Sequence, residues 1–280
     1  MLKRLIAGGK RVFGLHYPSH NLKVYPDDVF FVSYPKSGNT WIRFLIANLV
    51  YPEKNPDFSN IDALLPDPEG MSKRNLERVA RPRIVKSHLA FQPRFRNVIY
   101  VVRDPRDVVL SSYHFDIKRR AIPESYPLRE FVARFLAGDL NEHNPRYGTW
   151  GENVASWFYA RRDDPRFLLV RYESLQSQAL EEMRRIASFL GIPAETERLR
   201  MAVEQSSAKR MRELEKKQGH LWKSTRDTQP GKPFVRSAKA GGWKSDLPQE
   251  CVTEIESKWG DLMRDMQYEL TVPGMVGSAT

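Results

Sequence analysis

Apolar segments of six or seven residues alternate with longer segments of helical character along most of this chain. The short segments are mostly rich in Val, Ile and Phe, which indicates buried strands over 28–33, 83–88, 97–103 and 166–172. The longer segments indicate helices over 40–51, 106–119, 125–138, 152–162, 176–190, 195–217 and 248–266. Such an alternation predicts a single α/β domain in which a central parallel sheet is flanked by helices.

The same pattern suggests where the domain begins and ends. We expect the folded domain to cover 26–270, after an N-terminal segment, 1–25, and before a disordered tail, 271–280. Lys10 and Arg11 interrupt the first apolar patch too early for a signal peptide, and no apolar run is long enough to cross a bilayer. The sequence therefore predicts a cytoplasmic protein without stable membrane insertion, although a basic N-terminal helix touching a membrane surface is an alternative.

Charge and cysteine content narrow the possible partners. The chain has 45 Lys and Arg against 34 Asp and Glu, a formal net charge of +11. This balance favours anionic partners such as phosphate-bearing cofactors, nucleic acid or anionic lipid, and a solvated basic surface is the simpler alternative. Cys251 is the only cysteine, which excludes an intrachain disulfide and a cysteine-based zinc site.

The turn after the first strand has the composition of an anion-binding loop. Residues 34–41 read Tyr-Pro-Lys-Ser-Gly-Asn-Thr-Trp and lie where backbone N–H groups and the positive end of a helix dipole converge. Gly38 lets the backbone approach a phosphate closely, and Lys36 adds a full charge. Side-chain donors are supplied by Ser37, Asn39 and Thr40. We predict a P-loop-like phosphate site here, and a tight strand–helix turn without a ligand is the alternative.

A second strand–turn–helix carries a similar set of groups. Arg103 ends the third strand, and Ser111 lies two helical turns beyond the Asp-Pro break that follows. A guanidinium and a hydroxyl so placed can grip one phosphate from two sides. The alternative is a local ion pair between an Arg and an Asp at the end of a strand.

The end of the second strand offers a proton acceptor. Lys86 and His88 alternate there, so both side chains point to the same side at the edge of the sheet where ligands usually bind. A histidine can accept a proton near neutral pH. The alternative is a structural histidine, since the chain contains six.

Taken together, these segments resemble the cytosolic-type sulfotransferases. Residues 34–41 are similar to the family's Tyr/Phe-Pro-Lys-Ser-Gly-Thr-Thr-Trp, and 86–89 to its Lys-Thr-His-Leu. Residues 103–107 resemble its Arg-Asn/Asp-Pro-Lys/Arg-Asp, and 148–157 its Gly-Ser-Trp-x-x-His-Val-x-x-Trp. The resemblance extends from about Val29 to Met266 and implies transfer of a sulfuryl group from 3′-phosphoadenosine 5′-phosphosulfate (PAPS) to a hydroxyl or amine. The product nucleotide would be adenosine 3′,5′-bisphosphate (PAP), and no metal would be needed.

The resemblance also implies roles for individual residues. His88 would be the general base, while Lys36 and Lys86 would steady the sulfuryl group and the leaving bridge oxygen. Trp41 would stack on adenine, and Arg103 and Ser111 would hold the 3′-phosphate with a third, C-terminal residue, Arg236. The full set of cofactor-binding residues would be Lys36, Ser37, Gly38, Asn39, Thr40, Trp41, Arg103, Ser111, Tyr172, Ser206, Arg236, Ser237 and Ala238.

The chain departs from the family pattern in three places. Ala208 stands where the family usually has a Phe that covers the second face of adenine. Ser237 and Ala238 replace a Lys-Gly pair. Pro248 and Gln249 interrupt the family's dimer motif, so we expect a monomer or a different dimer.

The acceptor is the least determined part of the sequence-based hypothesis. In this family variable loops build the acceptor pocket, here expected over 55–81, 118–144 and 219–233, and their polar, basic character favours a polar, anionic or carrier-bound acceptor. Alternatives to the enzyme as a whole are a small-molecule kinase, an inactive relative that binds PAPS, and a polyanion-binding protein suggested by the charged run 209–217. We favour the sulfotransferase with no nucleic-acid partner.

Overall fold

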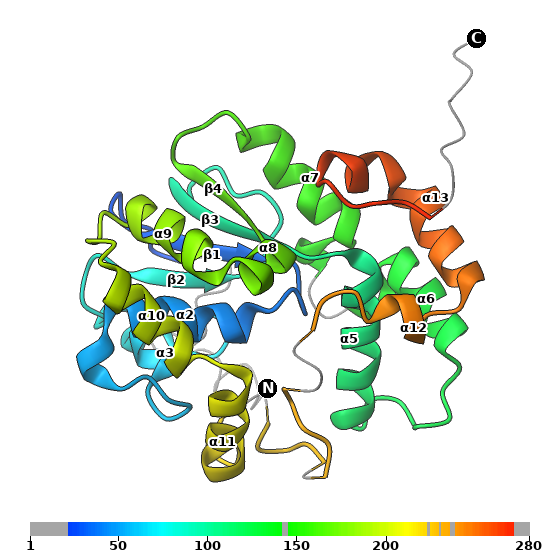
Figure 1. Cartoon of the computed structure of the whole chain (residues 1–280), viewed down its shortest axis with the longest axis horizontal. Coiled ribbons are helices and arrows are strands. Elements are labelled where there is room, and N and C mark those ends of the chain that lie inside the picture. The colour runs from blue at the N-terminus through cyan, green and yellow to red at the C-terminus, as the bar shows by residue number, and fades with distance from the viewer. Residues whose placement is uncertain (1–21, 142–144, 223–224, 230, 236–238, 272–280) are drawn as a thin grey trace, which may run out of the picture.

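The sheet consists of parallel strands, as the sequence predicts. The computed structural model describes residues 22–141, 145–222, 225–229, 231–235 and 239–271, and within these it has four strands in the order β2-β1-β3-β4 (Figure 1). They are β1 (Val29–Ser33), β2 (Ile84–Ser87), β3 (Asn97–Val102) and β4 (Phe167–Arg171). Val29 is paired with Ile84 of β2 and with Asn97 of β3, so these strands end at the same edge. The loops after them are therefore neighbours in space.

Helices cover both faces of the sheet (Figure 1), which confirms the predicted fold class. Phe30, Val32 and Tyr100 point into a core shared with α5, α6, α7 and α13. The alternate residues Phe31 and Ile99 point into a second core, shared with α2, α9 and α10. The longer helices are α2 (Asn39–Val50), α5 (Pro105–Lys118), α6 (Leu128–Ala137), α7 (Trp150–Arg161), α9 (Ala179–Phe189), α10 (Thr196–Gln205), α11 (Ala208–Gln218) and α13 (Gln249–Asp265).

Some helices are shorter or more numerous than the apolar pattern predicts. The expected helix over 176–190 is two helices, because α8 (Tyr172–Ser177) starts earlier and ends before α9. The expected helix over 195–217 is broken at 206–207, where the Ser207 hydroxyl accepts a hydrogen bond from the Arg210 amide and caps α11. Short elements also occupy segments predicted as loops: α3 (Ile61–Leu64), α4 (Lys73–Glu77), α12 (Trp243–Asp246) and the 3₁₀ turns Pro52–Lys54, Asp139–Asn141 and Pro145–Tyr147. Within the described parts of the chain, no helix is both long and apolar enough to cross a membrane.

A buried ion-pair network ties the C-terminal part of the domain to the start of α5. Arg106 is 2.6 Å from Asp104, the N-cap of α5, and 2.5 Å from Glu256 of α13. Its guanidinium also lies 3.6 Å from the ring centre of Trp243. One residue along, the Asp107 carboxylate accepts hydrogen bonds from the Gly241 and Trp243 amides at 2.7 and 3.0 Å. These contacts hold the segment that begins at 239 against the helix that follows Arg103.

We expect Arg106→Ala to lower the free energy of unfolding by about 3–5 kcal/mol, because it leaves two buried carboxylates without their cation. Urea unfolding followed by circular dichroism measures the loss. Arg162→Ala is the matched control, since Arg162 is exposed and lies 3.6 Å from Asp163, which is also exposed. That control is expected to cost less than about 1 kcal/mol. Equal, small losses in the two variants would contradict the role of the network.

Candidate active site

Most of the residues chosen from the sequence line one cavity at the carboxyl edge of the sheet. The cavity has a volume of about 470 Å³ and is formed by the loops after β1, β2 and β3 together with α2, α5, α8, α10 and α11. The sequence-predicted residues on its wall are Lys36, Gly38, Asn39, Thr40, Trp41, Lys86, His88, Arg103, Ser111 and Tyr172. Two phosphate-type loops and the candidate base, separate in sequence, are thus brought together.

The remaining predicted residues are placed differently. Ser37 is fully buried beneath the loop. Ser206 is also fully buried, where its hydroxyl accepts a hydrogen bond from the Asn48 amide at 3.0 Å and its carbonyl accepts one from the Trp41 indole at 2.9 Å. Ser206 therefore lies behind Trp41 and orients the indole, and it is not on the cavity wall. Arg236, Ser237 and Ala238 lie outside the described residues.

The first loop requires glycine at position 38. Gly38 has φ +88°, in the left-handed region that favours glycine, and a Cβ added there would lie 2.5 Å from the Tyr172 ring. Lys36 also has a positive φ, 67°, so the turn is tight at two points. The helix α2 starts directly after this turn, and the side-chain amide of Asn39 donates to the Ser33 hydroxyl at 3.1 Å. The backbone is consequently held in the form that exposes the start of α2 to the cavity.

Arg103 is anchored loosely at the second loop. Its guanidinium lies 4.3 Å from the ring centre of Tyr172 and 3.6 Å from the Asp107 carboxylate. It donates long hydrogen bonds to the carbonyls of Lys36 and Lys239, at 3.4 and 3.3 Å. Its Nε is buried without a hydrogen-bond partner among the described residues. A buried guanidinium with donor capacity to spare is suited to an anion of the phosphate type.

Lys36 carries its charge in an unfavourable environment. Its ammonium lies 3.7 Å from the ring centre of Phe115 and 5.0 Å from that of Phe234. Burial lowers its pKa to about 7, with Asp116 opposing this effect and Arg103 adding to it. An anion beside Lys36 would raise this pKa again, because it would favour the charged form.

His88 is held in one tautomer. Its Nδ1 lies 2.7 Å from the Ser33 carbonyl oxygen, which can only accept, so Nδ1 carries the proton and Nε2 carries the lone pair. The Tyr147 ring packs edge-on against the imidazole, with 5.7 Å between centres. Burial, and then the nearby Lys86, lower the pKa of His88 to about 3. Between pH 3 and 6.5 the folded protein thus binds fewer protons than the unfolded chain. The free energy of unfolding therefore decreases as the pH falls through that window.

A model of the Sulfotransferase domain family matches residues 26–267. The chain belongs to the sulfotransferase family. "Sulfotransferase 1E1" of Bos taurus is 28% identical over 274 residues, covering 91% of this chain and 88% of the relative. "Sulfotransferase 1B1" of Mus musculus is 30% identical over 238 residues, covering 79% and 77%. The expected family is confirmed.

Solved structures show the same fold at lower identity. A mouse sulfotransferase, SULT7A1, complexed with PAP has a TM-score of 0.70 and 22% identity, covering 91% of this sulfotransferase and 90% of the mouse chain. Retinol dehydratase in complex with androsterone and PAP has a TM-score of 0.70 and 21% identity, covering 92% and 85%. These likenesses confirm the architecture of the domain.

Sequence reasoning missed an ion pair on the wall of this sulfotransferase's cavity. The Lys86 ammonium lies 2.7 Å from the Asp67 carboxylate, and the Lys86 amide donates to the Pro66 carbonyl at 2.9 Å. Burial alone would raise the pKa of Asp67, but Lys86 and Arg43 lower it well below its usual range. Arg43 in turn lies 2.8 Å from Asp62. The sequence gives no local signal for these pairs, because each joins residues that lie about twenty positions apart.

The expected acceptor loops contribute unequally. Asp62, Asp67 and Gly70 come from the first loop and Trp222 from the third, while no described residue of 118–144 lines the cavity. The wall also includes Phe115 and Phe234. Together with Trp222 they make it more apolar than the composition of the loops suggests. Ala208 lies on the wall with Val203 and Met211, so the side expected to cover adenine is lined by small or flexible side chains.

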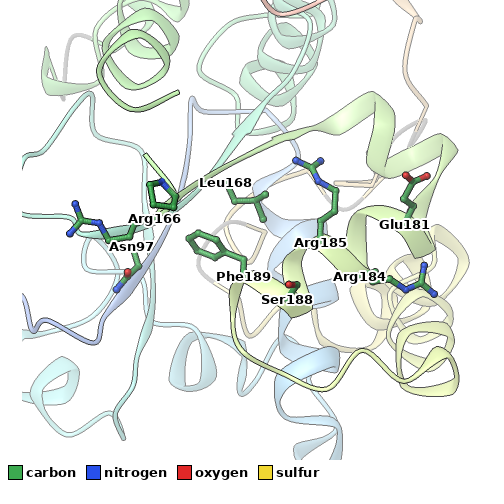
Figure 2. Close-up of a pocket in the computed structure, with 9 residues that line it drawn as sticks. Asn97, Arg166, Leu168, Glu181, Arg184, Arg185, Ser188 and Phe189 are labelled. Atoms are coloured by element: carbon green, nitrogen blue, oxygen red, sulfur yellow. The ribbon is translucent and has the colours of Figure 1, made fainter. Parts of the chain in front are cut away.

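A second hollow in this sulfotransferase lies at the opposite edge of the sheet (Figure 2). It has a volume of about 950 Å³ and is a surface groove between the starts of β3 and β4 and the helix α9. Arg166 is paired with Asp164, and Arg185 with Glu182. This groove contains none of the predicted site residues, and two of the three arginines that line it, Arg166 and Arg185, are paired with carboxylates.

We expect Gly38→Ala to destabilise this sulfotransferase by more than the backbone strain alone, because Tyr172 must move. Gly191→Ala is the matched control, since Gly191 also has a positive φ, +66°, but nothing lies within 4 Å of an added Cβ. The strain common to both is about 1–2 kcal/mol, and the clash adds about 1–3 kcal/mol at Gly38. Urea unfolding measures the free energy of unfolding of both variants. PAP titration tests whether only Gly38→Ala weakens PAP binding. Equal losses in both assays would contradict the packing argument.

Proposed function

We propose that this protein transfers the sulfuryl group of PAPS to a hydroxyl or amine on a small acceptor, with His88 as the general base. The observation that carries the proposal is the shared cavity, where a histidine of fixed tautomer faces the same space as Lys36, Lys86 and Arg103. Proton removal and charge neutralisation are the two tasks that such a transfer sets for an enzyme.

The residues fit the proposed donor. Among the described residues, Ser37 Oγ and Arg103 Nε are buried without a hydrogen-bond partner, and both lie at the predicted phosphate loops. The Lys36 ammonium rests on aromatic rings, in an environment that depresses its pKa. Phosphate oxygens in the cavity would bind the Arg103 guanidinium and the Lys36 ammonium, since both residues line it, whereas Ser37 lies beneath the loop. PAP, the nucleotide that such a donor leaves, is present in the solved structures of two relatives named above.

Each residue then has a defined task. PAPS, when bound, supplies a sulfuryl group attached to a phosphate that leaves readily. Arg103 and Ser111, with Arg236, would hold the 3′-phosphate, while the loop 36–40 would hold the 5′ side through backbone N–H groups and hydroxyls. Trp41, oriented by the Ser206 carbonyl and packed edge-on against Tyr172 at 5.4 Å, would bind adenine.

His88 and the lysines would act on the acceptor side. His88 Nε2 would receive the acceptor's proton, and the Nδ1 bond to Ser33 would stabilise the imidazolium that forms. An anion near His88 would raise its low pKa towards a useful range. Lys36 and Lys86 would balance the negative charge that develops on the departing oxygen.

The acceptor proposed here has an apolar ring system next to its reactive group. Phe115, Trp222 and Phe234 line the cavity, and Trp222 packs edge-on against Phe234 at 5.3 Å. Aromatic walls of this kind bury flat apolar surface efficiently. Androsterone, which is present in the retinol dehydratase structure, has this character.

The polyanion-binding alternative has less support. The charged run 209–217 lies on α11, where Arg210 is 3.6 Å from Glu213 and Lys118 of α5 is 3.2 Å from Glu215. Acidic groups interspersed along the helix offset the basic ones, so it does not present the uniform basic face that nucleic acid favours.

We expect PAP to bind with a micromolar dissociation constant and 5′-AMP to bind far more weakly, because only PAP carries the 3′-phosphate. Calorimetry measures both, with ATP and Mg²⁺ as a third ligand. Arg103→Ala should weaken the affinity for PAP about 10- to 100-fold, because it removes a hydrogen bond between charged groups. Arg129→Ala removes the same charge from an exposed site and should leave the affinity unchanged. A preference for ATP and Mg²⁺ would overturn the proposal.

We expect His88→Gln to lower turnover about 10²- to 10⁴-fold while PAP affinity stays within about twofold, because only proton removal is lost. PAP release from PAPS is followed with a panel of phenols, steroid alcohols and aryl amines. His220→Gln makes the same substitution at an exposed histidine and should keep full turnover. Undiminished turnover in His88→Gln would refute the assignment of the base and leave the nucleotide assignment standing.

A further inference from the structure

The helix α7 is bonded to the main chain of the active-site loops. The Trp150 indole donates to the Arg103 carbonyl at 3.0 Å, and the Trp157 indole donates to the Leu89 carbonyl at 2.9 Å. Between them, the Asn153 amide donates to the His88 carbonyl at 3.0 Å. A helix expected to supply core aromatics therefore also determines where the second and third strand ends lie.

Asn153 is fully used as a hydrogen-bonding group. It has no exposed surface and does not line the cavity. Its Nδ2 donates to the His88 carbonyl and, at 2.7 Å, to the Tyr147 carbonyl, while its Oδ1 accepts from the Tyr100 hydroxyl, also at 2.7 Å. A flipped amide would place its oxygen against two carbonyl oxygens, so the orientation is fixed by the partners.

The two carbonyls that Asn153 holds belong to the catalytic histidine and to its ring neighbour. The imidazole of His88 is bounded by the Ser33 carbonyl on one side and the Tyr147 ring on another. The Tyr147 hydroxyl donates in turn to Glu69, so the ring is fixed at both ends. Movement of either main-chain segment would shift the direction of Nε2.

We infer that Asn153 is a positioning residue for His88, holding the main chain of His88 and of Tyr147 so that Nε2 faces the acceptor. The inference rests on the proposed role of His88 as base. The cost of misplacing a base by about 1 Å is large, up to about a hundredfold in rate.

The test observes the His88 imidazole directly. Long-range ¹H–¹⁵N NMR reports the tautomer and the pKa of each histidine ring, and the His88 signals are assigned by their loss in His88→Gln. In the parent protein we expect the Nδ1–H tautomer and a pKa of about 3. Asn153→Ala should give mixed tautomers and a pKa higher by about one unit or more, since water reaches a ring that burial had kept neutral.

Other charges near the ring are unchanged by this substitution. They are Lys86 on β2, Asp67 in the loop before α4, and Arg43 on α2. A change in the signals therefore reports the position of the ring and its contact with water.

Matched variants separate positioning from general loss of stability. Val154→Ala removes fully buried volume from the next residue of α7 without touching the hydrogen bonds, and should lower the melting temperature while leaving the His88 signals unchanged. Tyr100→Phe removes only the hydroxyl that holds Oδ1, so it should shift the signals in the same direction by less. It also serves as the decisive variant if Asn153→Ala does not fold.

Turnover supplies the second readout. Asn153→Ala should lower kcat about tenfold or more, with PAP affinity within about twofold, because the nucleotide loops are untouched. His88 signals and kcat equal to those of Val154→Ala would overturn the inference. The NMR readout needs neither nucleotide nor acceptor, so failure of PAP binding would remove the proposed function and leave this result interpretable.

Discussion

Burial of positive charge is the constraint on which the active site depends. Lys36, Lys86 and Arg103 lie together at the carboxyl edge of the parallel sheet. Lys86 lies 2.7 Å from its carboxylate partner Asp67, whereas Lys36 rests on aromatic rings and Arg103 is 3.6 Å from the Asp107 carboxylate. Desolvated cations with incomplete partners raise the free energy of the folded state, and that cost falls when an anion arrives. This cost supports the proposed donor, which carries several negative charges.

The rest of the domain keeps these cations in place. Parallel pairing with a shared register brings the ends of β1, β2 and β3 to one edge. Below them, the Arg106 network fixes the start of α5, while Asp107 ties the segment beginning at 239 to the same helix. On the other face, Tyr172 fills the space that Gly38 leaves open and lies beneath Arg103. Packing thus sets the distances that the chemistry uses.

Much of this arrangement could be predicted from the sequence because its signals are local. Strands such as 97–103 are apolar on both faces, so the expected bounds differ from β3 by one residue. The two loops proposed to bind phosphate follow directly after β1 and β3, and Gly38 and Arg103 lie within a few positions of these strand ends. Chain order and the rules for parallel sheets were then enough to predict that these residues lie close together.

Other parts of the site could not be predicted because they depend on contacts between distant segments. The hydroxyl of Ser206, at the break between α10 and α11, is bonded to Asn48, which is 158 positions away. Asp67 reaches Lys86 through a loop whose path has no pattern in the sequence. Asn153 was hidden within an aromatic helix motif, since its polar partners come from β3 and from the loop after β2.

The depressed pKa values of His88 and Lys36 follow from the same physical situation. In both, burial is the largest cause, and neighbouring positive charge adds to it. A polyanion bound among these groups opposes both effects at once, because it favours the protonated form of each. In the proposed reaction, His88 would be a weak base while the cavity lacks an anion and a stronger one once an anion is bound. Proton removal from an acceptor by His88, as proposed, would then be coupled electrostatically to the binding of an anion beside Lys36.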